Sequence, residues 1–215
     1  FMGTLFGVLM VPLLYVFLKN LFGKTVVALC GTALFTFDFM HLTQTRIATI
    51  DSYGVFFILA MFFFLYRYLA LPAGTPWRRC ALPLFLSGLM FGLGAASKWI
   101  VIYGGAGMAV LYFLGLYWKC RDWPQGEDAP RRGVWVCQTL LFSVFCFVVV
   151  PLVIYVASYL PTTHAEGVTD WKGLLELVWD NQVFMLTYHS GVDTPHPYSS
   201  RWYQWLLDIR PILYY

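Results

Sequence analysis

From Ser52 to Leu71 the sequence reads SYGVFFILAMFFFLYRYLAL, twenty residues with a single charge, Arg67. A helix needs roughly 20 apolar residues to cross the 30 Å or so of bilayer hydrocarbon. Because no water is available there, a spanning segment must satisfy its backbone hydrogen bonds internally, as a helix does. The segment therefore predicts a membrane-spanning helix.

Comparable apolar segments recur along the chain, on both sides of this one. The six predicted spans are Phe1–Leu18, Leu21–Phe37, Ser52–Leu71, Ala81–Ser97, Trp99–Tyr117 and Gly133–Tyr159. Of the 215 residues, 60% are hydrophobic and only 12% are charged, whereas a soluble domain carries about a quarter charged residues. We therefore expect an all-α, polytopic membrane protein built as a transmembrane helix bundle.

The hydropathy falls after Pro161, which predicts two parts. Residues 1–161 would form the helix bundle, and residues 162–215 an extracytoplasmic loop segment with one short amphipathic helix near Trp171–Leu186. The chain opens on Phe1 inside an apolar run and stops at Tyr215 without an obvious ending, so we expect an internal fragment of a longer protein.

The basic residues predict the orientation. With six spans, nine lysines and arginines fall on one side and five on the other. The first side holds Lys19, Lys24, Arg67, Arg78, Arg79, Lys119, Arg121, Arg131 and Arg132, and the second Arg46, Lys98, Lys172, Arg201 and Arg210. Because cytoplasmic loops carry the excess of Lys and Arg, the second side is expected to be extracytoplasmic.

Several function classes find no support in the sequence. The net charge of +3 includes no run of like charges, so we expect no nucleic-acid partner. The five cysteines form no CxxC pair and no metal-binding spacing. A glycine-rich phosphate loop, a nucleophile elbow and an HExxH motif are also missing. We expect no cofactor and no metal.

Ionisable residues gather in FDFMHLTQTRIATID, residues 37–51, at the predicted outer boundary. Such groups are costly at this depth and usually face a cavity or a partner. Arg46 presents a planar fork suited to phosphate oxygens. Asp51 is expected to pair with Arg46 or to orient it, with His41 in a supporting position. An arginine that reaches the headgroups beside Asp51 explains the same pattern.

Lys98 lies between two apolar spans, after the small residues of GLGAAS, 92–97. Its ammonium can bind a phosphate as a point charge. An interfacial lysine next to a tryptophan, here Trp99, is the ordinary alternative.

The segment 189–215 concentrates histidine, arginine, tryptophan and tyrosine around several prolines. Aromatic faces can stack on sugars, and arginine or histidine can contact a phosphate or an acceptor. The candidates are His189, His196, Tyr198 and Trp202 for sugar or acceptor binding, and Arg201 and Arg210 for phosphate binding. A membrane-surface loop with aromatic residues at the headgroups is the alternative.

Four motifs in this order resemble the protein O-mannosyltransferase family, especially its bacterial members. They are TRIATID (Thr45–Asp51), KW (Lys98–Trp99), SYLP (Ser158–Pro161) and HPYSSRW (His196–Trp202), the last followed by RPILYY (Arg210–Tyr215). The resemblance rests on the four motifs occurring together in this order. The likeness spans nearly the whole chain.

The resemblance implies a GT-C glycosyltransferase of the bacterial plasma membrane, with its catalytic face extracytoplasmic. The donor would be mannose on a polyprenyl or dolichyl phosphate, and the acceptor a Ser or Thr hydroxyl of a translocating protein, with inversion at the sugar and without a metal. The short external segment favours a polyprenyl carrier. The family's general base, in an Asp-Glu pair of the first external loop, would precede Phe1. No catalytic base is therefore assigned in this chain.

Two other functions stay open at this point. A related GT-C enzyme would transfer aminoarabinose or another lipid-linked sugar to lipid A or a glycan, and the same cations would serve. A transporter or lipid-binding scaffold would carry out no catalysis, but it predicts repeated, discontinuous helices that the sequence does not show.

Overall fold

The computed structural model describes residues 2–47, 49–125, 131–191, 200–205 and 209. Within these ranges every regular element is a helix, which confirms the all-α prediction. The chain divides into two compact units, Phe1–Ser158 and Tyr159–Tyr215. We describe each unit by itself.

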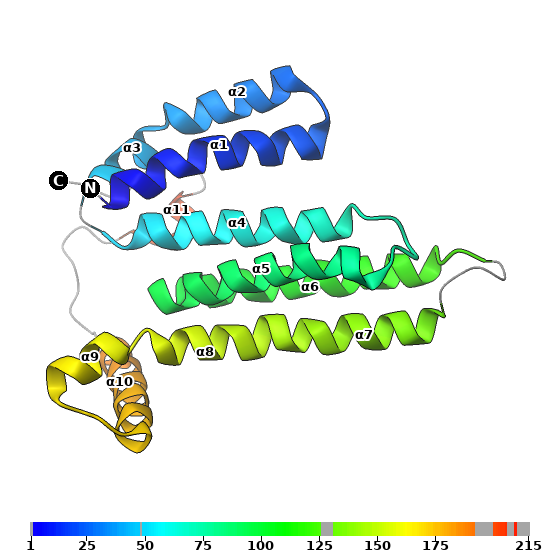
Figure 1. Ribbon diagram of the computed structural model, residues 1–215. Helices are drawn as coiled ribbons and strands as arrows, with labels where there is room; N and C mark the ends of the chain where they lie inside the picture. Colours follow the sequence, from blue (N-terminus) through cyan, green and yellow to red (C-terminus); the bar gives the residue numbers. More distant parts are fainter. Residues whose placement is uncertain (1, 48, 126–130, 192–199, 206–208, 210–215) are drawn as a thin grey trace. The chain divides into compact units, whose positions relative to one another are not determined.

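The first unit is a bundle of long antiparallel helices (Figure 1). Its elements are α1 (Met2–Phe22), α2 (Thr25–Thr36), α3 (Phe39–Arg46), α4 (Asp51–Leu69), α5 (Trp77–Ser97), α6 (Ile100–Arg121), α7 (Arg132–Val144), the π-helical turn η1 (Phe145–Val149) and α8 (Val150–Ala157). Helices α4, α5 and α6 lie between α1–α3 on one side and α7–α8 on the other (Figure 1). The loops therefore collect at two opposite ends.

The described helices include five that are long and apolar enough to cross a membrane, or six if the bent pair α2–α3 counts as one span. The prediction of a polytopic bundle with about six spans is confirmed. Helix α5 begins four residues earlier than predicted, at Trp77, and α6 continues to Arg121.

The second predicted span, Leu21–Phe37, differs from the structure. Helix α2 has only 12 residues, about 18 Å of helix, which is too short to cross the hydrocarbon by itself. The region after it, predicted as a polar break, forms the eight-residue helix α3, bent by 54° from α2. Asp38 explains the break: its backbone is extended, and its carboxylate accepts the His41 N–H at 2.9 Å as the N-cap of α3.

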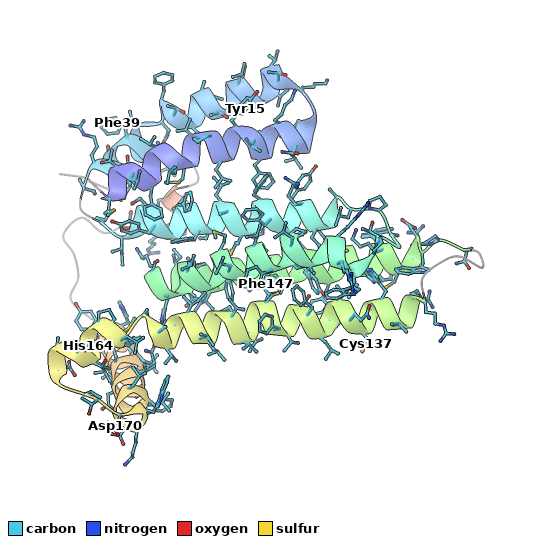
Figure 2. All side chains as sticks on the ribbon, viewed as in Figure 1. Tyr15, Phe39, Cys137, Phe147, His164 and Asp170 are labelled. Atoms are coloured by element: carbon cyan, nitrogen blue, oxygen red, sulfur yellow. The ribbon has the colours of Figure 1, made fainter. Side chains whose placement is uncertain are left out.

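The core of the bundle is packed closely where small residues face a neighbouring helix. Gly88 of α5 lies against the backbone of η1, and a Cβ added there would come within 2.7 Å of the Cys146 carbonyl carbon. Met61 and Leu65 of α4 and Val101 of α6 are almost completely buried between these helices. Cys137, by contrast, projects from the outer side of α7 (Figure 2).

The second unit contains α9 (Leu160–Glu166), α10 (Trp171–Ser190) and α11 (Trp202–Trp205). Gly167 ends α9 in the left-handed conformation, with φ of 72°. The Tyr159 hydroxyl accepts hydrogen bonds from Asn181 and Gln182 of α10. The predicted short helix near Trp171–Leu186 corresponds to α10, which continues to Ser190. Its placement outside the bilayer stays a prediction.

Candidate functional site

A pair of glycines brings α3, which carries Arg46, against the first turns of α1. Gly3 and Gly7 face Thr45 across this contact, and a Cβ on Gly7 would come within 2.7 Å of the Thr45 Cβ. The Thr4 hydroxyl also donates to the Thr45 carbonyl at 3.1 Å. Because the two helices touch through small residues, as in GxxxG contacts, α1 fixes the position of Arg46 at the end of α3.

A cavity of about 300 Å³ lies beside Arg46 at this end of the bundle. Its wall is formed by Met2, Gly3, Thr4, Thr45, Arg46, Ile47, Thr49, Ile50 and Tyr53. Three threonines and a tyrosine thus line the same cavity as the one arginine. Among the described residues, the Arg46 side chain has no salt bridge and no hydrogen bond. This arrangement is chemically suited to an anion.

Lys98 and Asp51 form a salt bridge at the same end of the bundle. Asp51 is the first residue of α4, and Lys98 follows α5 in extended conformation. Both side chains are partly exposed, 30% for Lys98 and 42% for Asp51. Asp51 thus pairs with Lys98 and not with Arg46, because the short α5–α6 connection brings the ammonium to the first turn of α4. A role of Asp51 in orienting Arg46 stays a prediction.

Trp99, next to Lys98, contacts a different helix from Lys98: it is hydrogen-bonded to α8 and not to α4. Its indole N–H donates to the Tyr155 hydroxyl of α8 at 3.1 Å. The two-residue connection between α5 and α6 is thus tied to α4 through Lys98 and to α8 through Trp99. Tyr155 lies near the outer end of the last predicted span, Gly133–Tyr159, but it was not among the predicted site residues.

His41 was predicted to support Arg46, and several hydroxyl-bearing residues near Arg46 were not predicted at all. The His41 ring lies 4.2 Å from the Phe35 ring, on the α2 side of the helix break. Its supporting role for Arg46 stays a prediction. The sequence reasoning missed Thr4, Thr45 and Tyr53, although Gly3 and Gly7 at four-residue spacing are a signal for the close α1–α3 contact.

The remaining predicted site residues belong to the second unit. His189 is exposed in the last turn of α10, and its ring meets the Tyr188 ring edge-on at 5.4 Å. Arg201 is exposed and donates to the Tyr203 hydroxyl at 3.1 Å. Trp202 begins α11, while His196, Tyr198 and Arg210 lie outside the described residues. The convergence of these side chains with Arg46 and Lys98 stays a prediction.

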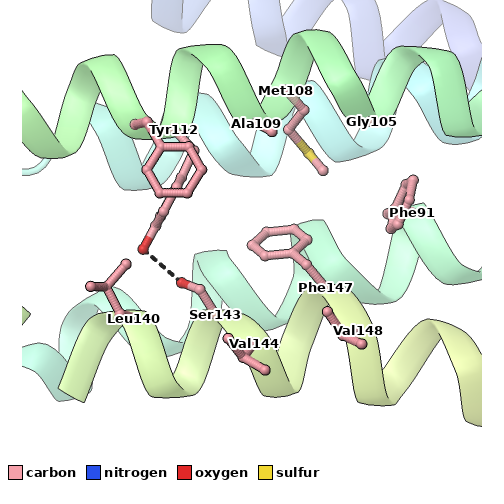
Figure 3. A pocket seen from close by; sticks show the side chains of 11 residues that line it. Phe91, Gly105, Met108, Ala109, Tyr112, Leu140, Ser143, Val144, Phe147 and Val148 are labelled. Atoms are coloured by element: carbon pink, nitrogen blue, oxygen red, sulfur yellow. Dashed lines mark hydrogen bonds between the residues drawn. The ribbon is translucent and has the colours of Figure 1, made fainter. Parts of the chain in front are cut away.

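A second cavity, also of about 300 Å³, lies between α5, α6 and the α7–η1 segment (Figure 3). Its wall is almost entirely apolar, with Phe91, Met108 and Phe147 among its residues. The one polar feature is a hydrogen bond of 2.8 Å from the Ser143 hydroxyl to the Tyr112 hydroxyl. Because no carboxylate, histidine, lysine or arginine among the described residues lines it, this cavity is suited to hydrocarbon and not to acid–base chemistry.

Fold and site together define a multi-pass membrane helix bundle with cations and hydroxyl groups gathered at one end. The family model described as dolichyl-phosphate-mannose-protein mannosyltransferase matches residues 1–165. The chain belongs to this family, which confirms the resemblance seen in the motifs.

The chain is also similar over its whole length to curated bacterial proteins named polyprenol-phosphate-mannose–protein mannosyltransferase. It is 24% identical to the protein of Mycobacterium tuberculosis, covering 100% of this chain and 47% of that protein. The values are 23% and 48% for Mycolicibacterium smegmatis, and 24% and 48% for Corynebacterium glutamicum. The chain thus spans about half the length of the relatives it matches. No solved structure matches it significantly.

Proposed function

We propose that the protein transfers mannose from a polyprenyl-phosphate carrier to Ser or Thr hydroxyls of translocating proteins. The transfer would take place at the extracytoplasmic face of a bacterial plasma membrane. The family and the names of the relatives support mannose on a polyprenol phosphate as donor and a protein as acceptor. The excess of basic residues at the opposite end of the bundle supports the orientation.

The observation that carries the proposal is the Arg46 cavity. A guanidinium without a partner among the described residues faces a space of about 300 Å³ lined with hydroxyl groups. Its place at the end of α3 puts it at the boundary between the apolar helices and the loops. A lipid-anchored phosphate would be held at this same boundary by its hydrocarbon chain.

The chemistry of transfer explains why cations are needed there. Breaking the bond between the sugar and the phosphate leaves negative charge on the phosphate oxygens. Fixed positive groups around those oxygens stabilise the developing charge without reorganising during the reaction. Arg46 would bind two phosphate oxygens through its planar fork, and Lys98 would add a second cation.

Asp51 would act as a positioning residue for Lys98. An ammonium has three N–H donors, and the salt bridge to Asp51 engages one of them. Two donors therefore stay available for phosphate oxygens while the carboxylate fixes the direction of the side chain. Asp51 would also be stabilised by the positive end of α4, because it lies in the first turn.

The other parts of the site would come from the second unit and from outside these 215 residues. Arg201 and Arg210 would close over the phosphate, and His189, His196, Tyr198 and Trp202 would contact the sugar or the acceptor. The general base would be supplied by a loop preceding Phe1.

The test is transfer of radiolabelled mannose from polyprenyl phosphate in membranes that contain the full-length protein. We expect label in protein, released by alkaline β-elimination from Ser or Thr. Label in lipid A or a glycan instead would support the related sugar transferase. No transfer despite intact donor binding would support a lipid-binding scaffold.

A further inference from the structure

A third cavity is lined by residues at the starts of α5 and α7. These two helix starts lie at the end of the bundle opposite α3, which carries Arg46 (Figure 1). It measures about 460 Å³, within the usual range of ligand sites. Pro76, Trp77 and Arg78 contribute from α5 and its N-cap, and Arg131, Trp135 and Gln138 from α7 and its N-cap. None of these residues belongs to the site proposed for mannosyl transfer.

Positive charge accumulates at this cavity without compensation among the described residues. The N-termini of α5 and α7 both lie in its wall, and each helix has a positive dipole end and unpaired N–H groups there. Neither helix has an acidic residue in its first turn or a side-chain cap. Arg78 and Arg131 add two exposed guanidinium groups that make no salt bridge in the described part of the chain.

Apolar and aromatic side chains form the rest of this cavity, and they are held in place. Trp135 is 3% exposed, and its indole N–H donates to the Thr75 carbonyl at 2.8 Å. The Trp77 ring packs edge-on against Phe142 at 5.9 Å. A preformed apolar wall next to two guanidinium groups matches a molecule with a negative head and a hydrocarbon tail.

We infer that this cavity binds the phosphate headgroup of an anionic glycerophospholipid. The phosphate would contact Arg78 and Arg131 and the N-termini of α5 and α7, and an acyl chain would follow Trp77 and Val134 toward the apolar helices. Basic pockets between membrane helices bind lipid phosphates in this manner. This inference rests on the chain spanning a bilayer, and it would hold whether or not the protein transfers mannose. Only the leaflet, the cytoplasmic one, follows from the proposed orientation.

The sequence supplies a matched control, because another arginine follows each of the two. R78Q/R131Q removes the two guanidinium groups in the cavity wall, while R79Q/R132Q removes two neighbouring charges that lie outside it. The full-length protein would be incubated with equal amounts of phosphatidylglycerol and phosphatidylcholine, and the retained lipid counted by native mass spectrometry.

We expect the wild type and R79Q/R132Q to retain phosphatidylglycerol in excess, with ratios within about threefold of each other because exposed charges are screened. R78Q/R131Q should lower the ratio about tenfold or more, as expected for lost charge-assisted hydrogen bonds. Each single variant should give a partial loss, which keeps the test valid if the double variant does not fold. Mannosyl transfer in detergent should be the same for both pairs.

Three results would overturn the inference. One is an unchanged lipid ratio in folded R78Q/R131Q. An equal loss of phosphatidylglycerol in both pairs would likewise contradict it, because lipid retention would then depend only on the net charge at this end of the bundle. The third is release of the bound lipid by millimolar glycerol 3-phosphate, which would make the site one for a soluble phosphate.

Discussion

Arg46 combines a charged side chain, a polar cavity and a position at the end of a helix held by glycines. Arg46→Ala should lower mannosyl transfer by about 100-fold or more, because removing one preorganised donor from a developing negative charge costs that much. Arg46→Lys should restore part of the activity. Transfer of labelled mannose in membranes measures both, with Arg79→Ala at the opposite end as the control. Full activity of Arg46→Ala would leave Arg46 as a headgroup contact only.

The salt bridge between Asp51 and Lys98 gives a prediction of a different kind. Asp51→Asn should lower transfer by between about tenfold and 100-fold, since a misplaced catalytic group is costly. The same change in a Lys98→Met background should have little further effect, because the partner is already gone. In an Arg46→Lys background its effect should be undiminished. Coupling to Arg46 instead of Lys98 would contradict the pairing in the structure.

At the scale of elements, the contact between α1 and α3 decides where Arg46 lies. Gly7→Val should displace α3, because any side chain at this position overlaps Thr45. We expect a loss of stability of about 1–3 kcal/mol, typical of overpacking, together with a loss of transfer. Gly133→Ala is the control, since a Cβ there has no atom within 4 Å. Thermal unfolding in detergent and transfer assays distinguish the two variants.

The packing interface between α6 and the α7–η1 segment includes a hydrogen bond between two buried hydroxyl groups. Ser143→Ala removes the partner of Tyr112, and both residues are at least 94% buried. Hydrogen bonds between membrane helices contribute about 0.6–1.7 kcal/mol, so we expect a decrease of that size in the free energy of unfolding. Tyr112→Phe in the Ser143→Ala background should add little. Cys137→Ala, on the outer side of α7, should leave stability unchanged.

For the whole molecule, the two ends of the bundle should be reached from opposite sides of the membrane. In a cysteine-free background, Phe39→Cys at the start of α3 should react with an impermeant maleimide in intact cells, because it lies at the α2–α3 break, next to the charged Asp38. Lys24→Cys, between α1 and α2, should react only after the membrane is opened. The reverse pattern would place Arg46 in the cytoplasm and exclude the proposed extracytoplasmic site.

Hydropathy and charge alone predicted the helical class, the number of spans and which charged residues share an end of the bundle. These properties are sums over local segments: twenty apolar residues must cross the bilayer as a helix whatever their neighbours are. The four motifs, taken in their order along the chain, likewise predicted the family, because each is a local stretch of sequence.

Only the tertiary structure decided which charged residues pair and which helices touch. Asp51 and Arg46 are five residues apart, yet Asp51 pairs with Lys98, 47 residues away, because helix packing sets which charged groups meet. The cavity at Arg46 depends on the contact of Gly3 and Gly7 with Thr45, which joins α1 to α3. Such contacts are set by the relative placement of whole helices, which no local pattern of residues records.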